Sequence, residues 1–137
     1  MDTKKGMEVR EGFFYTEKHE WVKAAEDGTA LCGITDFAQH SLGDIVFVEF
    51  PSSLLDSSIE KGEVIAVVES AKAASDVYSP VSGQVVELNS AVEDTPDTVN
   101  SSPYDEGWFI RIELSDRKEL DSLMSASAYR DFLASGG

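Results

Sequence analysis

The chain has 137 residues, 42% hydrophobic and 27% charged, which suffices for one domain with a core but not for two. Its 26 acids outnumber its 11 lysines and arginines, and the resulting net charge of −15 argues against nucleic acids and anionic membrane surfaces as partners. No apolar run approaches the length needed to span a membrane.

The N-terminal residues 1–12 are largely polar and contain no apolar stretch after their lysines. They therefore lack the pattern of a secretory signal. We expect residues 1–12 to form a flexible tail and residues 13–137 to form a single domain that ends in a helical extension.

The only cysteine, Cys32, lies in an apolar, strand-like segment. A buried free thiol is the expected state at such a position. With no second cysteine for a disulfide, the chain is expected to work in a reducing compartment, which we take to be the cytoplasm.

Strand-like segments and turn signals alternate through the first third of the domain. Aromatic and β-branched residues predict strands over 13–15, 20–24 and 30–34. Asp27-Gly28 is a typical hairpin turn between the second and third of these strands.

A short helix is predicted over residues 36–42. Thr35 or Asp36 can cap its N-terminus, and Gly43 can end it in a left-handed conformation. The β-branched and aromatic segment 44–51 then predicts another strand.

The rest of the chain continues the same pattern of strands and turns and adds helices near its end. We expect strands over 64–68, 77–80, 81–89 and 108–114, a long loop over 94–104, a helix from 115 with Leu120, Leu123 and Met124 on one face, and a last helix over 128–133. About seven or eight strands with frequent turns indicate a mainly β fold, a flattened two-sheet barrel-sandwich with helical additions.

Lys72 is the most informative residue of the sequence. It stands between two strand-like runs, at the tip of a predicted hairpin, with Ala71 and Ala73 on either side. A lysine with so little steric cover suits a residue that other proteins modify. The nearby Glu69 and Asp76 favour its charged ammonium form, which disfavours a Schiff-base enzyme. An ordinary solvated lysine in a turn is the alternative.

Other catalytic chemistry is sparse in this sequence. No glycine-rich loop has the dinucleotide-binding or phosphate-binding form. His19 and His40 are the only histidines, and a metal site built from them with carboxylates is disfavoured. We therefore expect no metal and no catalytic residue.

The segment 69–83 closely resembles the lipoyl-attachment segment of the H proteins of the glycine cleavage system. Further matches lie in order along the chain, and the resemblance covers roughly residues 13 to 133. The related biotin carriers have Met-Lys-Met at the modified position, so Ala71 and Ala73 favour lipoyl over biotinyl. The further matching segments are 19–22, 33–39, 42–48, 99–104 and 107–108, together with Tyr129.

This resemblance implies that residues 13–137 form a lipoyl-carrier domain, a non-catalytic subunit with lipoate attached to Lys72 through an amide. The implied partners are a pyridoxal-phosphate-dependent glycine decarboxylase, an aminomethyltransferase and dihydrolipoamide dehydrogenase. A lipoate ligase or octanoyltransferase would load the lysine. The carrier is expected to be a monomer that binds neither nucleic acid nor membrane.

The resemblance also implies roles for three carboxylates. Glu20 and Asp76 would contribute to a surface cleft that receives the loaded arm, where carboxylates can hold a protonated amine. Glu69 would help modifying enzymes to recognise the site. Their alternative roles are a solvated strand residue, a turn-stabilising aspartate and a charged strand end, respectively. Some family members have serine where Lys18 stands and histidine where Phe37 stands.

Two other functions remain open at the level of the sequence. The first alternative function is that of a lipoyl donor or regulatory carrier, which passes lipoate to other enzymes without handling glycine. In the second, which we disfavour, the protein would be an unmodified adaptor that binds partners through its acidic surface.

Overall fold

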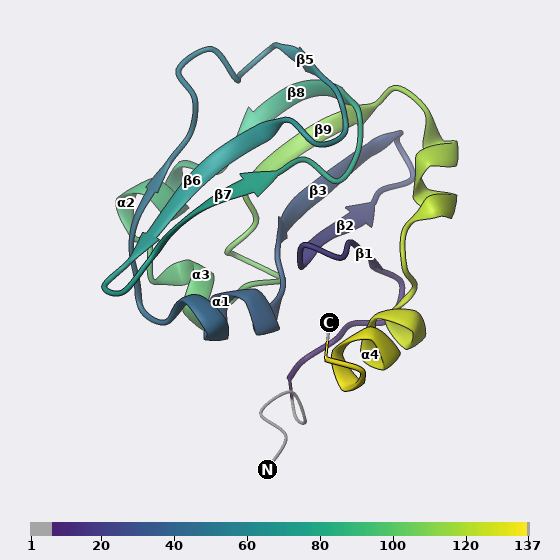
Figure 1. The fold of residues 1–137 in the computed structure, drawn as a ribbon. Helices are drawn as coiled ribbons and strands as arrows, with labels where there is room; N and C mark the ends of the chain where they lie inside the picture. Colours follow the sequence, from purple (N-terminus) through teal and green to yellow (C-terminus); the bar gives the residue numbers. More distant parts are fainter. Residues whose placement is uncertain (1–6, 137) are drawn as a thin grey trace.

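The computed structural model describes residues 7–136 and consists of two antiparallel sheets with short helices around them (Figure 1). The larger sheet has the strand order β1-β2-β3-β9-β8-β5, and the smaller has the order β4-β6-β7. The two sheets pack face to face and do not close into a barrel. The expected class, a mainly β two-sheet fold with a few helices, is confirmed.

The strands are short, and most are joined by tight turns. Their bounds are β1 Phe14–Tyr15, β2 Glu20–Ala24, β3 Thr29–Ile34, β4 Ile45–Glu49, β5 Ser58–Ile59, β6 Val64–Ser70, β7 Ala74–Tyr78, β8 Gly83–Leu88 and β9 Ile110–Leu114. The helices are α1 Asp36–Leu42, α2 Ser90–Asp94, α3 Thr98–Ser101, the 3-10 helix η1 Arg117–Ser122 and α4 Ala126–Ala134.

Alternation along the strands builds the main core between the sheets. Val22, Ile65, Val68, Ile110 and Ile112 are all buried there. In an antiparallel strand the inward side chains alternate with outward ones, so each strand contributes one apolar face. Because β6 contributes to this core, the hairpin that it forms with β7 is anchored on the body of the domain.

A second, aromatic cluster joins the N-terminal strands to α4. Tyr15 stacks on Tyr129 with ring centroids 4.5 Å apart, and Phe13 contacts Trp21 and Tyr104 at 5.2 and 5.6 Å. Such ring pairs stabilise a fold beyond the area that they bury. The C-terminal helical extension is therefore packed onto the sheet.

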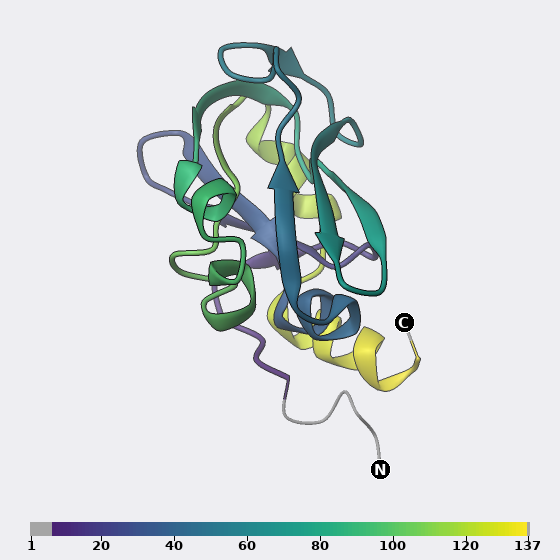
Figure 2. The same cartoon turned by 90° about the vertical axis from the view of Figure 1, so that its left-hand side faces the viewer.

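Helix α1 forms as its caps predict. The hydroxyl of Thr35 accepts a hydrogen bond from the backbone N–H of Ala38, and Gly43 closes the helix with φ of 85°. In Figures 1 and 2, α1 lies at the same end of the molecule as the tip of the β6–β7 hairpin.

The expected loop over residues 94–104 is wrong. Helix α2 reaches Asp94, and α3 spans Thr98–Ser101 inside that segment. The Asn89 side chain caps α2, and Val92 and Val99 are fully buried. The composition of this segment is typical of turns and shows no helical period. Each helix is held in place by the burial of a single valine, which leaves no periodic pattern in the sequence.

The helix expected from residue 115 is also different. The segment forms η1, which ends at Ser122, and Leu120 is its buried residue. Met124 does not share that helix face, because its backbone exchanges two hydrogen bonds of 2.8 Å with Tyr15. Between β4 and β6, Ser58 and Ile59 form the short strand β5, which pairs with β8.

The N-terminal segment lies partly outside the described residues, which begin at Met7. Within residues 7–12, Arg10 forms a two-pronged ion pair with Asp105 at 2.7 and 2.8 Å. Tyr104 donates a hydrogen bond to the carbonyl of Glu8. The described part of this segment thus contacts the domain, and its flexibility stays a prediction.

Cys32 is fully buried between the sheets, as predicted, and burial raises the pKa of its thiol. None of the helices within residues 7–136 has the length and apolar character that a bilayer crossing requires.

Candidate functional site

Lys72 lies at the tip of the β6–β7 hairpin, where Ser70 organises the turn. The N–H of Ser70 donates to the carbonyl of Ala73 at 2.7 Å. Its hydroxyl oxygen accepts from the N–H of Lys72 at 3.3 Å and from that of Ala73 at 3.1 Å. A serine that satisfies the turn amides in this way defines the backbone without glycine. The sequence Ser-Ala-Lys-Ala therefore encodes both the turn and its exposure.

The Lys72 side chain is open to solvent, as are Ala71 and Ala73. On one side its stem lies against the end of α1. A Cβ built on Gly43 would lie 3.4 Å from Lys72 Cε. Small neighbours thus surround a primary amine that an enzyme pocket can enclose.

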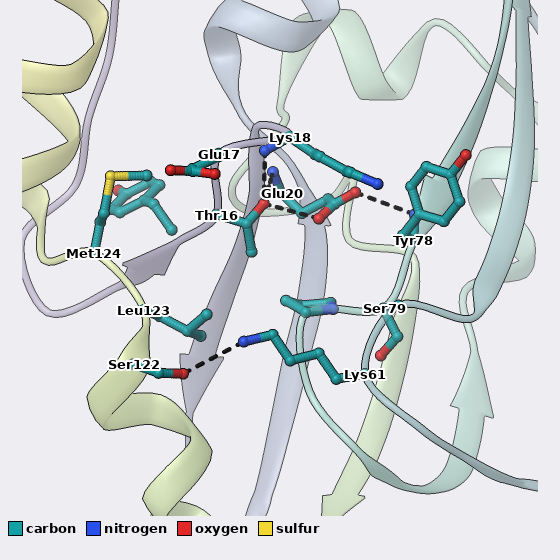
Figure 3. A pocket seen from close by; sticks show the side chains of 13 residues that line it. Thr16, Glu17, Lys18, Glu20, Lys61, Tyr78, Ser79, Ser122, Leu123 and Met124 are labelled. Atoms are coloured by element: carbon teal, nitrogen blue, oxygen red, sulfur yellow. Dashed lines mark hydrogen bonds between the residues drawn. The ribbon is translucent and has the colours of Figure 1, made fainter. Parts of the chain in front are cut away.

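A groove opens at the other end of β7, between the two sheets and the segment that follows η1 (Figure 3). Its volume is about 650 Å³. Four segments that are far apart in sequence form its walls: the β1–β2 turn, the β5–β6 turn, the start of the β7–β8 connection and residues 122–124. The lining residues are Tyr15, Thr16, Glu17, Lys18, Glu20, Lys61, Gly62, Tyr78, Ser79, Pro80, Ser122, Leu123 and Met124.

Glu20 is the buried carboxylate of this groove, with only 4% of its surface exposed. The Thr16 hydroxyl donates to its Oε1 at 2.8 Å, and the backbone N–H of Tyr78 donates to its Oε2 at 3.1 Å. Burial raises the pKa of Glu20, while these two hydrogen bonds and the charge of Lys18 partly oppose that rise. Among residues 7–136, no ion pair includes Glu20.

Two lysines border the groove. Lys18 Nζ lies 4.1 Å from the ring centroid of Tyr78, a cation–π contact. Lys61 reaches across and donates to the Ser122 hydroxyl at 3.3 Å. Figure 3 shows these two lysines on opposite sides of Glu20. Both are exposed and can move away from a ligand that enters.

The β1–β2 turn that carries Lys18 is braced from α4. Tyr129 OH lies 2.7 Å from His19 Nδ1 and 2.8 Å from the Thr35 hydroxyl. The ring of Phe37 packs 4.6 Å from that of His19. His19 itself has φ of 67°, a conformation that its contacts must stabilise. A residue of the last helix thereby positions the groove.

The structure separates the four site residues that the sequence singles out. Glu20 lines the groove, whereas Lys72, Glu69 and Asp76 do not. Glu69 and Asp76 are exposed on the hairpin strands, on the outer face of the smaller sheet. Asp76 and Tyr78 share a strand face, so Asp76 lies roughly 7 Å along β7 from the groove wall.

Sequence reasoning missed Thr16, Lys61 and Tyr78 as neighbours of Glu20. Alternation along β7 places Tyr78 on the face of Asp76, a signal that was available. Thr16 and Lys61 carry no such signal, because only the fold brings their turns together.

The arrangement offers two chemical features. One is an exposed amine that can form an amide. The other is a buried carboxylate without an ion-pair partner, at the wall of a groove, which favours a cationic group. The β7 strand, about 13 Å long, connects the two regions.

The chain matches the family model described as glycine cleavage H-protein over residues 13–136. It is 54% identical over 127 residues to the glycine cleavage system H protein of Coprothermobacter proteolyticus, covering 93% of this chain and 98% of that protein. The H protein of Thermus thermophilus is 49% identical, covering 94% and 98%. A crystal structure of the glycine cleavage system H protein from Mycobacterium marinum matches with a TM-score of 0.80 at 34% identity, covering 94% and 99%.

Proposed function

The chain belongs to the glycine cleavage H-protein family, the lipoyl carriers of that system, and from this premise we propose that Lys72 bears the lipoyl group. The observation that carries the proposal is the exposure of Lys72 at the tip of an anchored hairpin. A carrier needs an attachment point that other proteins reach from solvent, and no other feature of the site meets that need as directly.

The residues around Lys72 fit an acylated lysine. Ala71 and Ala73 leave room for a modifying enzyme, and Gly43 lets the lysine stem lie across the end of α1. When bound, a lipoyl group supplies a dithiolane whose sulfurs carry the aminomethyl group from glycine and exchange electrons. The hairpin's part is to hold the point of attachment still. A tethered group then meets each docked enzyme at a raised effective concentration.

Glu20 is proposed to hold the charged amine of the carried group in the groove. The carboxylate is buried, already accepts two hydrogen bonds and lacks an ion-pair partner among the described residues. An ammonium group beside it would supply the missing opposite charge in a charge-assisted hydrogen bond. Asp76, on β7 between the hairpin tip and the groove, is proposed to help guide that cation.

Glu69 is proposed to mark the site for the enzyme that loads Lys72. It is exposed on β6, three residues before the lysine, and pairs across the hairpin with Ala74. Because strand pairing and the Ser70 hydrogen bonds hold the hairpin, Glu69 keeps a defined place next to the turn that carries the lysine. A basic side chain of the loading enzyme can pair with a carboxylate at such a position.

The partners belong to the glycine cleavage system. We propose in particular the pyridoxal-phosphate-dependent decarboxylase, the aminomethyltransferase and dihydrolipoamide dehydrogenase, with a lipoate ligase or octanoyltransferase as the loading enzyme. The protein is proposed to act in the cytoplasm as a monomeric carrier that performs no catalysis itself.

Replacement of Lys72 by alanine tests the proposed attachment site. Wild type, Lys72→Ala and Lys61→Ala are each incubated with lipoate, ATP and a lipoate ligase, and intact masses are measured. We expect one added lipoyl group on wild type and on Lys61→Ala, because Lys61 lies in a different exposed turn. Lys72→Ala should stay unmodified. Loading of Lys72→Ala to the wild-type level would refute the assignment.

A further inference from the structure

The outer face of the smaller sheet is open to solvent, and the strand register defines its side chains. Residues directly opposite each other in antiparallel strands point to the same face of a sheet. Two rows of three residues therefore cross β4, β6 and β7 on this face. We call them the outer patch: Phe47, Glu69 and Ala74 in one row, and Glu49, Val67 and Asp76 in the other.

Phe47 is the large apolar side chain of the outer patch and is 44% exposed, while its neighbour Val46 is 60% exposed. In a regular strand, one of two consecutive side chains would point into the core. The register between β4 and β6 shifts between Ile45 and Phe47, which marks a bulge. A bulge leaves one residue out of the ladder, and here it turns two adjacent apolar side chains toward solvent.

Asn100 holds this bulge in place from α3. Its Oδ1 accepts from the N–H of Ile45 at 2.9 Å, and its Nδ2 donates to the carbonyl of Gly43 at 3.0 Å. Nδ2 also donates to Oε1 of Gln39 at 2.8 Å. One of these hydrogen bonds holds the first residue of β4, and the other two hold Gln39 of α1 and the glycine that follows that helix. The entry into β4 is thereby fixed, so the exposure of Phe47 is built into the fold. A preorganised surface loses less conformational freedom when a partner binds.

The outer patch is acidic as well as apolar. Glu49, Glu69 and Asp76 are all exposed, and Lys72 is the only basic residue of β4 and the β6–β7 hairpin. An apolar side chain ringed by carboxylates complements an apolar pocket ringed by basic side chains.

The position of the outer patch relative to Lys72 selects the partner. The Lys72 stem lies against Gly43, two residues before β4 begins, and Phe47 lies opposite Glu69 on the neighbouring strand. An enzyme that acylates the amine must bring its active site to Nζ itself, so it must cover the surface around the base of the hairpin tip. Enzymes that react at the far end of an attached arm have no such requirement.

We propose that the outer patch together with Val46 is the docking surface for the acyl-transferring enzyme that loads Lys72, with Phe47 as its apolar anchor. The inference rests on the proposed function, because it takes Lys72 as the acceptor. The partner's complementary surface is an apolar pocket for Phe47, bordered by lysine or arginine side chains that face the three carboxylates.

The rate of loading tests this surface. The kcat/KM for transfer of lipoate by a lipoate ligase is measured by intact mass for wild type, Phe47→Ala, Val46→Ser and Leu55→Ala. Leu55 is the matched control, since it is 49% exposed but lies outside the sheets. We expect roughly a tenfold fall for Phe47→Ala, mainly through KM, because aromatic side chains dominate interface energies. Val46→Ser should fall less, and Leu55→Ala should match wild type.

The contribution of the three carboxylates of the outer patch is measured in the same loading assay, as a function of salt concentration. The triple variant Glu49→Gln, Glu69→Gln, Asp76→Asn should load more slowly at low salt and lose most of the salt dependence shown by wild type. Glu113→Gln, on β9 of the other sheet, is the control and should behave as wild type.

Equal loading of Phe47→Ala, Val46→Ser, Leu55→Ala and wild type would overturn this docking surface while leaving Lys72 as the acceptor. Failure of wild type itself to be loaded would instead count against the proposed function. Urea unfolding of each variant checks that the compared proteins are folded, and exposed side chains at these positions make large losses of stability unexpected.

Discussion

The proposed site depends on two charged residues, and their surroundings are opposite. Lys72 stands in solvent between alanines, where its amine is accessible. Glu20 is buried at a groove wall, where it accepts two hydrogen bonds and forms no ion pair with any residue that the structure describes. The exposure of Lys72 suits an amine that enzymes modify. The burial of Glu20 suits a carboxylate that binds a cationic ligand. Residue type alone could not distinguish these roles.

The burial of Glu20 predicts a pH effect on stability. The unfolded chain has an ordinary glutamate pKa of about 4.3, whereas burial raises the pKa in the folded state. The folded protein holds this proton more tightly, so Glu20 favours folding below about pH 4.3, and that contribution is lost as pH rises through the raised pKa. Relative to Glu20→Gln, the free energy of unfolding of wild type should therefore fall across this window.

Urea unfolding of wild type and Glu20→Gln at a series of pH values measures this difference. Glu17→Gln is the control, since Glu17 is exposed at the same groove. The quantity compared is the free energy of unfolding of wild type minus that of Glu20→Gln. If this difference stays constant or rises with pH, the folded state does not disfavour the charged carboxylate of Glu20.

At the scale of elements, short pieces of structure hold the functional ones in place. Helix α3 has four residues and would not form alone in water. Its Val99 is buried, and its Asn100 binds Gly43, which follows α1, and Ile45, the first residue of β4. The start of β4, and with it the outer patch, is therefore held by a helix that contributes no residue to that patch.

Replacement of Asn100 by alanine measures this dependence. The change leaves the N–H of Ile45 and the carbonyl of Gly43, which form part-buried hydrogen bonds with Asn100, without this partner. An unsatisfied group that is fully buried costs roughly 1–3 kcal/mol. We expect the free energy of unfolding to fall by about 2–4 kcal/mol in a urea titration. Ser101→Ala, one residue further along α3, should change it by less than about 0.5 kcal/mol. Equal stability of both variants would mean that Asn100 does not hold β4.

Local signals predicted some elements and not others. Thr35 and Gly43 cap α1 as expected, and the Lys72 turn forms between its two strands. These features depend on residues close in sequence. Helix α3 and the pairing of Met124 with Tyr15 depend on contacts with distant segments. Residues that meet only after the sheets pack leave no periodic pattern to read.

At the scale of the whole molecule, the two-sheet core separates Lys72, the proposed attachment point, from the groove. Lys72 is at one end of β7, and Glu20 contacts the other end through Tyr78. Sequence resemblance named both Lys72 and Glu20, but the groove walls come from four segments that spacing alone does not relate. The net charge of −15 favours partners with basic surfaces.

Peptide mapping of the loaded protein tests the central claim most directly. Wild-type protein is loaded by a lipoate ligase and digested, and tandem mass spectrometry locates the added group on the chain. A single lipoyl amide on Lys72, with every other lysine unmodified, is the predicted result. A lipoyl group on a different lysine, or an unmodified Lys72 in fully loaded protein, would contradict the account.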